Sequence, residues 1–220
     1  MKAIEAVIFD LDGLLIDSEP LWQEAEILVF KQVNIDLTRQ LCLQTKGLRI
    51  DEVVDYWYQR YPWTTLSQLE IADLIVDRLI ELIFLKGEPL SGVEDAITFV
   101  RQKPVKIALA SSSASNIIRA ALQKLELSDV FARVYSAESE ILGKPHPGVY
   151  LTTANQLNVA PQKCLAIEDS LNGVLAAKAA QMKCIAIPEL SQQNNPKFAI
   201  ADRILHSLAE FNEEVWNSFN

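Results

Sequence analysis

Cysteine, glycine and long apolar runs are scarce in this sequence. The 3 cysteines, Cys42, Cys164 and Cys184, lie far apart and follow no metal-ligand spacing, so we expect reduced thiols and a cytoplasmic protein. No uninterrupted apolar run approaches the length of a signal sequence or a membrane span, so we expect no membrane partner. With 7 glycines and 50% hydrophobic residues in 220, the composition predicts a folded globular protein and argues against disorder.

Positive charge is also in short supply. The chain has 20 Lys and Arg residues against 29 Asp and Glu residues, a formal net charge of -9 at pH 7. Nucleic acids and anionic membranes bind basic surfaces, so this balance argues against both as partners. An anionic substrate would need positive charge gathered locally in its site.

Most of the chain alternates between short apolar stretches rich in Val, Ile and Ala and helical patterns. This alternation is typical of an α/β fold with a parallel sheet covered on both faces. The predicted strands are 4–9, 105–110, 133–136, 164–167 and 184–187, and the predicted helices are 93–102, 115–125, 148–157, 171–180 and one after Ser207.

The stretch from about Ser18 to Lys86 breaks the alternation, because its apolar residues recur at helical spacing only. Ser67 and Glu70 fit a capping box at the start of its last helix, and Ser91 and Glu94 fit one just beyond the stretch. The sequence therefore predicts an α/β core of residues 1–16 and 88–220 with an inserted helical cap of residues 17–87. The cap would stand above the carboxyl edge of the sheet, where open α/β sheets bind ligands.

Two carboxylates follow the first predicted strand, in Val7-Ile8-Phe9-Asp10-Leu11-Asp12-Gly13. Residues i and i+2 of a strand lie on the same face, so Asp10 and Asp12 can converge at the strand end. Two acids that close together are stable only when a cation lies between them or when one of them is protonated.

Polar residues also follow two later strands and precede a helix. Ser111-Ser112-Ser113 follows one strand, Glu168-Asp169 follows another, and Lys144 lies between them in the sequence. Parallel strands bring all of these groups to one edge of the sheet. Each has a structural explanation taken singly, as a helix cap or a solvated lysine, but together they specify hydroxyls, an ammonium and four carboxylates around one pocket.

Carboxylate oxygens suit Mg²⁺, which keeps coordination positions for water and a substrate phosphate. With phosphate charge screened by Mg²⁺ and Lys144 and one oxygen held by Ser111, a carboxylate can attack phosphorus and form an acyl phosphate. Asp10 is the candidate nucleophile. Asp12 is the candidate acid and base, which protonates the leaving alkoxide and later takes a proton from water.

These motifs resemble those of the haloacid dehalogenase superfamily, in its phosphatase branch with a small helical cap. Asp10-Leu11-Asp12-Gly13 is similar to the first family motif, Ser111 to the second, Lys144 to the third and Glu168-Asp169 to the fourth. The resemblance spans essentially the whole chain and implies a Rossmann-like parallel-sheet core, a Mg²⁺ cofactor and a monomer. Relatives often have a cis peptide bond at the position of Lys144-Pro145.

The resemblance also implies roles for the acidic residues. Asp10 would be the nucleophile and a metal ligand, and Asp12 the acid/base and a ligand through its backbone carbonyl. Asp169 would bind the metal through its side chain. Glu168 would be a ligand either directly or through water.

Within the superfamily, the stretches 12–22, 47–51 and 144–147 resemble bacterial sugar phosphatases that act on 2-deoxyglucose 6-phosphate and hexitol phosphates. The alternative is β-phosphoglucomutase, which transfers phosphoryl groups between sugar positions. That enzyme has a histidine near the position of Trp22 and an arginine near Ile50, whereas this chain has its arginine one residue earlier, at Arg49. These departures favour hydrolysis of a small phosphorylated sugar or sugar alcohol.

Substrate contacts are expected from the core motifs and the cap. Arg49 follows Gly47 at a loop-to-helix start and either binds the phosphate or sugar or faces solvent. Trp22 either lines the sugar site or packs in the cap core, which its spacing with Ala25 and Val29 favours. The expected substrate-binding residues are Gly13, Asp17, Glu19, Arg49, Ser111, Ser112 and Lys144.

Overall fold

Six parallel strands form one sheet, in the order β3-β2-β1-β4-β5-β6, within residues 3–219, the part of the chain that this computed structural model describes. The strands are β1 (Ala6–Phe9), β2 (Lys106–Ser111), β3 (Arg133–Ser136), β4 (Cys164–Glu168), β5 (Lys183–Ala186) and β6 (Arg203–Ile204). The first five lie where the sequence predicts strands. The edge strand β6 was not predicted, because it has two exposed residues and no apolar pattern.

The central strand β1 has β2 on one side and β4 on the other. Phe9 pairs with Leu109 of β2 and with Ile167 of β4, and the backbone N–H of Asp10 donates to Ile167 O at 3.0 Å. All four residues of β1 are buried, as expected of a strand covered on both faces. This register brings the residues that follow the three strands to the same edge of the sheet.

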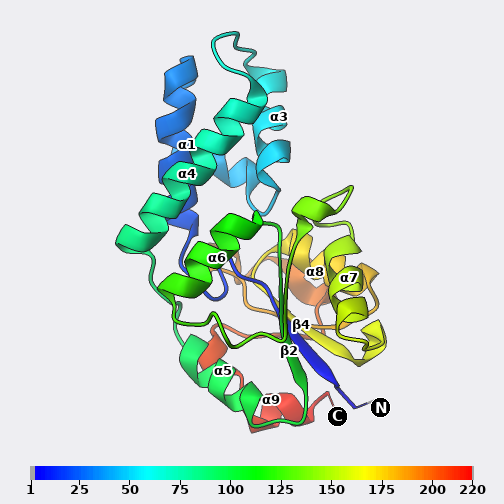
Figure 1. Cartoon of the computed structure of the whole chain (residues 1–220). Helices are drawn as coiled ribbons and strands as arrows, with labels where there is room; N and C mark the ends of the chain where they lie inside the picture. Colours follow the sequence, from blue (N-terminus) through cyan, green and yellow to red (C-terminus); the bar gives the residue numbers. More distant parts are fainter. Residues whose placement is uncertain (1–2, 220) are drawn as a thin grey trace.

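Helices cover both faces of the sheet. α5 (Val93–Arg101), α6 (Ser115–Lys124) and α9 (Glu213–Asn217) pack on the face that carries Val7 and Phe9. α7 (Gly148–Gln156) and α8 (Leu171–Ala179) pack on the other face, which carries Ala6 and Ile8. Figure 1 shows these two helical layers on either side of β2 and β4.

The remaining helices are α1 (Glu19–Phe30), α2 (Arg39–Cys42), α3 (Ile50–Arg60) and α4 (Gln68–Lys86). In Figure 1, α1, α3 and α4 form the end of the molecule opposite to the two chain termini, beyond the carboxyl edge of the sheet. Trp57 and Trp63 are buried among them. Two connections join this helical segment to the sheet, and Asp17 N donates to Glu88 O between them at 3.0 Å.

Two of the predicted capping boxes can be compared with the helix starts in the structure. The capping box of α4 is confirmed, because Glu70 N donates to Ser67 Oγ and Ser67 N donates to Glu70 Oε2. The box at Ser91 is wrong. The residue before α5 is Gly92, whose φ of +84° is easy only for glycine, so the chain enters the helix through a left-handed residue instead of a serine cap.

Short 3₁₀ turns complete the chain at Lys31–Val33, Leu43–Thr45, Ala137–Ser139, Pro161–Lys163, Leu190–Gln192, Pro196–Ile200 and Leu208–Glu210. The helix expected after Ser207 is thus a 3₁₀ turn followed by α9.

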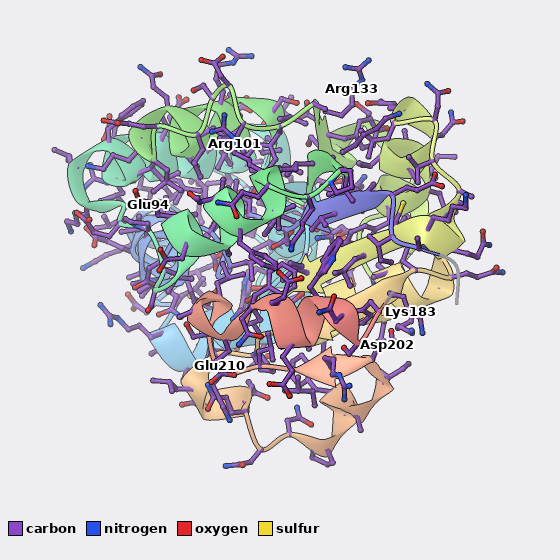
Figure 2. The ribbon with its side chains drawn as sticks, turned by 90° about the horizontal axis from the view of Figure 1, so that it is seen from below. Glu94, Arg101, Arg133, Lys183, Asp202 and Glu210 are labelled. Carbon is purple, nitrogen blue, oxygen red and sulfur yellow. The ribbon has the colours of Figure 1, made fainter. Side chains whose placement is uncertain are left out.

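Figure 2 shows the amino end of the sheet from below, with charged side chains around its rim. There Lys183 and Asp202 form an ion pair at 2.9 Å, which links β5 to the residue before β6. No helix within residues 3–219 is both long and apolar enough to span a membrane.

Candidate active site

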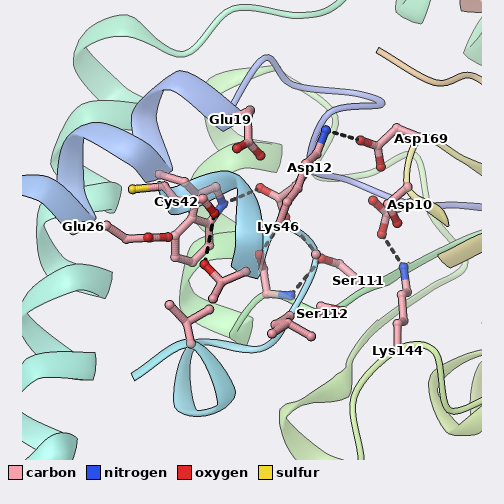
Figure 3. A pocket seen from close by; sticks show the side chains of 17 residues that line it. Asp10, Asp12, Glu19, Glu26, Cys42, Lys46, Ser111, Ser112, Lys144 and Asp169 are labelled. Atoms are coloured by element: carbon pink, nitrogen blue, oxygen red, sulfur yellow. Dashed lines mark hydrogen bonds and ion pairs between the residues drawn. The ribbon is translucent and has the colours of Figure 1, made fainter. Parts of the chain in front are cut away.

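Three strand ends and one loop bring the predicted core residues together at the carboxyl edge of the sheet. Asp10 follows β1, Ser111 ends β2 and Glu168 ends β4. Lys144 comes from the loop before α7, and Asp169 follows Glu168. All five side chains are buried, and Figure 3 shows four of them around one pocket.

Lys144 is the cation at the centre of this group. Its Nζ lies 2.6 Å from Asp10 Oδ1 and 2.6 Å from Glu168 Oε1, and it also donates to the Ala110 carbonyl at 3.2 Å. Tyr150 donates its hydroxyl to the same Glu168 oxygen at 2.5 Å. Burial works against the charge, but Asp10 and Glu168 raise the pKa of Lys144 above its usual value, so the ammonium stays charged. The Lys144-Pro145 peptide bond is cis.

Asp10, Glu168 and Asp169 form an acidic cluster in which one carboxylate oxygen of each lies within 4.8 Å of the others. Burial raises the pKa of Asp10 well above its usual value; Lys144 opposes that rise, and the neighbouring carboxylates add to it. Burial likewise raises the pKa of Asp169 to about 7. Three buried acids face two ammonium groups, Lys144 and Lys46, so negative charge remains uncompensated, which a bound cation would offset.

The donor set of this cluster fits a hard divalent cation. All three ligand atoms are carboxylate oxygens, the type that Mg²⁺ prefers. Asp169 Oδ2 is buried and accepts no hydrogen bond within residues 3–219; its neighbour is Lys46 Nζ, at an ion-pair distance of 3.3 Å. Lys46 thus stands next to the oxygen that would coordinate the cation.

Two glycines leave room for the acids. Gly13 has φ +72°, and a Cβ there would lie 2.4 Å from Asp169 Oδ2. A Cβ on Gly173, at the start of α8, would lie 2.0 Å from both carboxylate oxygens of Glu168. Neither position accepts a side chain unless the acid moves. Gly13, expected to bind substrate, lies beside the pocket and lines a neighbouring cavity instead.

The carboxylate of Asp12 lies outside the acidic cluster and accepts four hydrogen bonds. Ser18 Oγ and Trp22 Nε1 donate to Oδ1 at 2.6 and 3.1 Å. Ser113 Oγ donates to Oδ2 at 2.6 Å and Ser111 Oγ at 3.4 Å. Trp22 thus lines the pocket, whereas its spacing favoured the cap core; its indole N–H is used to hold Asp12.

The pocket is lined on one side by the core and on the other by the helical segment. Of the predicted residues, it includes Asp10, Asp12, Glu19, Ser111, Ser112, Lys144 and Asp169. Glu168 lies behind Lys144, and its exposed fraction is 0%. Ser112 Oγ is buried and has no hydrogen-bond partner in the described part of the chain, so its hydroxyl is available to a ligand.

Besides Gly13, two predicted substrate residues lie outside the pocket. Asp17 lines the neighbouring cavity, together with Pro188 and His206. The guanidinium of Arg49 donates to the carbonyl oxygens of Ala137 and Glu140 at 3.2 and 2.6 Å. Arg49 is the residue before α3, so its side chain crosses to the loop that leads to Lys144 and does not enter the pocket.

Lys46 and Glu26 line the pocket but were missed from the sequence. Lys46 Nζ pairs with Asp169 at 3.3 Å and with Glu189 at 2.7 Å. Burial opposes its charge, but the surrounding carboxylates raise the pKa of Lys46 above its usual value. The position of Lys46 just before Gly47 was a sequence signal that could have identified it as a pocket residue. For Glu26 the corresponding signal is its spacing of four residues from Trp22.

Comparison with known proteins points to the family that the sequence motifs resemble. The sequence profile of haloacid dehalogenase-like hydrolases matches residues 4–181. Hexitol phosphatase B of Escherichia coli (strain K12) is 43% identical over 210 residues, which are 95% of each chain. A phosphorylated carbohydrates phosphatase of Thermotoga maritima is 34% identical over 191 residues, covering 83% of this chain and 84% of that protein.

Two solved structures have the same fold throughout. β-Phosphoglucomutase from Clostridium difficile superposes with a TM-score of 0.85 at 27% identity, covering 98% of this chain and 96% of its own. CbbY from Rhodobacter sphaeroides in complex with xylulose-(1,5)bisphosphate superposes with a TM-score of 0.86 at 26% identity, covering 95% and 96%. The chain therefore belongs to the haloacid dehalogenase-like hydrolases, and within that family it is a phosphatase.

Proposed function

We propose that this enzyme hydrolyses the phosphate ester of small phosphorylated sugars and sugar alcohols, with Mg²⁺ and through a phosphoaspartyl intermediate on Asp10. One observation carries the proposal. The buried carboxylate of Asp10 lies 2.6 Å from Lys144 Nζ and within 4.8 Å of two further acids, Glu168 and Asp169. The hexitol phosphatase relative supports the substrate class.

Asp10, Glu168 and Asp169 would hold the metal, and bound Mg²⁺ would screen the charge of the phosphate as Asp10 approaches it. Lys144 adds positive charge beside the nucleophile, and the free hydroxyl of Ser112 can donate to a phosphate oxygen. These groups recognise the phosphate alone and are indifferent to the rest of the substrate.

In the first step a carboxylate oxygen of Asp10 attacks phosphorus in line, and the ester P–O bond breaks as the Asp10–phosphorus bond forms. Asp12 gives a proton to the leaving alkoxide, which departs as an alcohol. In the second step water attacks the same phosphorus, gives a proton to Asp12 and releases inorganic phosphate with the free Asp10 carboxylate. Asp12 must turn toward the ester for this, so the hydrogen bonds from Ser18 and Trp22 set its starting position.

We also propose that residues 17–87 act as a cap that closes over the pocket. The contacts across the boundary support this. Lys46 of the helical segment pairs with Asp169 and Glu189 of the α/β part, and Arg49 donates to carbonyls of the loop before Lys144. Hinge motion would occur near 15–17 and 86–89, where the two connections run side by side.

The charge distribution favours hydrolysis over the alternative mutase reaction. A mutase passes through a sugar bisphosphate, whose second phosphate needs a cation away from Asp10. The pocket residues within 3–219 include two cationic side chains, Lys46 and Lys144, and both pair with the acidic cluster. The opposite end of the pocket carries the carboxyl of Glu26, which offers a second phosphate no positive charge.

The test is release of inorganic phosphate from a panel of hexose 6-phosphates, hexitol phosphates and β-glucose 1-phosphate, with Mg²⁺ and with a chelator. Asp10→Asn is the blank, because an amide cannot form the acyl phosphate. Metal-dependent release that is absent from the Asp10→Asn variant is the expected result. Conversion of glucose 1-phosphate to glucose 6-phosphate with little phosphate release would show a mutase instead. Full activity in the Asp10→Asn variant would refute the covalent mechanism.

A further inference from the structure

Glu26 is an acidic residue buried in the wall of the pocket, and no cation within residues 3–219 forms an ion pair with it. It lies in α1, its exposed fraction is 5%, and it lines the same pocket as Asp10. The thiol of Cys42 contacts the carboxyl group. The Oε2 atom is buried and has no hydrogen-bond partner within residues 3–219. A buried oxygen without a hydrogen-bond partner raises the free energy of the folded protein. A ligand that donates a hydrogen bond to this oxygen removes that cost and so binds more tightly.

The position of Glu26 suits the end of the substrate that is remote from the phosphate. Ser18, Trp22 and Glu26 are spaced by four, and the first two donate to Asp12. Glu26 is therefore one helical turn beyond Trp22, about 6 Å further along the axis. Figure 3 shows Glu26 and Cys42 at one end of the pocket, with Asp10 and Lys144 at the other. Glu26 therefore lies on the side of the pocket away from Asp10 and Lys144, where the part of a substrate without the phosphate would lie.

The chemistry at this end suits a neutral hydroxyl. The groups that act on Glu26 are the Cys42 thiol and the carboxylate of Glu19, and neither is a cation. Burial raises the pKa of Glu26 to about 8, so the group keeps its proton at neutral pH. A protonated carboxyl can both donate and accept a hydrogen bond, as a hydroxyl can. A second phosphate or a carboxylate would meet no positive charge among the described groups that act on Glu26.

We propose that Glu26 Oε2 hydrogen-bonds a hydroxyl group at the end of the substrate away from the phosphate, and thereby selects polyhydroxylated monophosphates over phosphate esters of apolar alcohols. This assignment rests on the proposed function. It makes Glu26 a specificity residue that takes no part in the phosphoryl transfer itself.

The experiment compares two substrates in three variants. The substrates are the best sugar or hexitol monophosphate of the panel and p-nitrophenyl phosphate, which has no hydroxyl group. Glu26→Leu removes the hydrogen bond, Glu26→Gln keeps a donor and an acceptor, and Glu24→Gln changes the same residue type in the same helix outside the pocket. Glu24 pairs with Lys86 and is absent from the pocket wall.

Glu26→Leu should lower kcat/KM for the hydroxylated substrate by about 10- to 100-fold and leave p-nitrophenyl phosphate unchanged. Glu26→Gln should retain more of the sugar phosphate activity than Glu26→Leu, and Glu24→Gln should match the wild type on both substrates. Equal losses on both substrates in Glu26→Leu, or no loss on either, would overturn the assignment.

Failure of the proposed function would look different. A wild-type enzyme that cleaves p-nitrophenyl phosphate but no sugar phosphate would refute the proposed substrate class before any variant is made, and the Glu26 assignment with it. An active wild type whose discrimination does not depend on Glu26 would overturn the Glu26 assignment alone. Analogues that each lack one hydroxyl identify the partner, because the analogue without it should be insensitive to Glu26→Leu.

Discussion

Replacing Glu26 with Gln should stabilise the protein increasingly as the pH rises. In the folded protein burial raises the pKa of Glu26 from 4.5 to about 8. Between these values the unfolded chain releases the proton while the folded chain keeps it, so the wild type loses stability as the pH increases. At pH 7 this loss is 1.36 kcal/mol for each of about 2.5 pH units, or about 3 kcal/mol. Above pH 8 it approaches about 5 kcal/mol.

A glutamine does not titrate, so this pH-dependent loss should be absent from the variant. Urea unfolding followed by tryptophan fluorescence at about pH 5.5 and about pH 7.5 measures it. The difference in unfolding free energy between Glu26→Gln and wild type should grow by about 3 kcal/mol across that interval. Burying the amide of Glu26→Gln costs free energy equally at every pH. The test is therefore the change with pH in the difference between the two unfolding free energies.

Glu24→Gln is the matched control, since it removes a half-buried carboxyl from the same helix. Its unfolding free energy should run parallel to that of the wild type over the interval. The groups that face Glu26 are Glu19 in α1 and Cys42 in α2, and both remain in each variant. Parallel curves for Glu26→Gln and wild type would refute the reasoning, because Glu26 would then titrate alike in folded and unfolded chains.

Three further substitutions test other parts of the site. Asp169→Ala should raise the Mg²⁺ concentration needed for half-maximal activity without unfolding the protein; an unchanged calorimetric Mg²⁺ titration would contradict the ligand assignment. Arg49→Ala should lower kcat by about 10- to 100-fold, because its guanidinium holds the loop before Lys144; a change in steady-state KM alone would indicate a substrate contact instead. Gly173→Ala should destabilise the fold by about 2 to 4 kcal/mol, measured by thermal or urea unfolding, because its Cβ would overlap the Glu168 carboxylate; an unchanged midpoint would show that Glu168 can move away.

The α/β core could be predicted from the sequence because each element leaves a local signal. Strands buried on both faces read as apolar runs, and parallel strands place the residues that follow them at one edge. Asp10, Lys144 and Asp169 were found this way, and the structure brings them together. The edge strand Arg203–Ile204 gave no such signal, because both residues are exposed and their strand character comes only from pairing with β5.

The side of the pocket formed by residues 17–87 was harder to predict because helical and loop residues are placed by tertiary packing. Lys46 and Arg49 are three residues apart in one loop, and both are cationic. The sequence favoured Arg49 as the pocket residue, yet Lys46 lines the pocket and Arg49 crosses to the loop before Lys144. Which cation faces inward depends on where α3 begins, and a helix boundary is the least certain feature of a sequence pattern.

Helix α1 links the two ends of the pocket. One of its stripes, which includes Ala25 and Val29, packs in the core, and the adjacent polar stripe faces the pocket. Within that polar stripe Trp22 holds Asp12 at the reaction centre, while Glu26 stands at the remote end. Trp22 and Glu26 belong to the same helix, so we expect that a substrate hydroxyl bound to Glu26 also fixes the position from which Trp22 orients Asp12.

This coupling has a kinetic consequence. Binding energy gained at the remote hydroxyl would be used to orient the acid and base for phosphoryl transfer, so it should appear partly in kcat and not in KM alone. A substrate that leaves Glu26 unsatisfied would still bind through its phosphate at Lys144, but would leave α1 free to shift. We therefore expect discrimination among sugar phosphates to depend on the pocket as a whole, although Glu26 lies one helical turn away from Trp22, which holds Asp12.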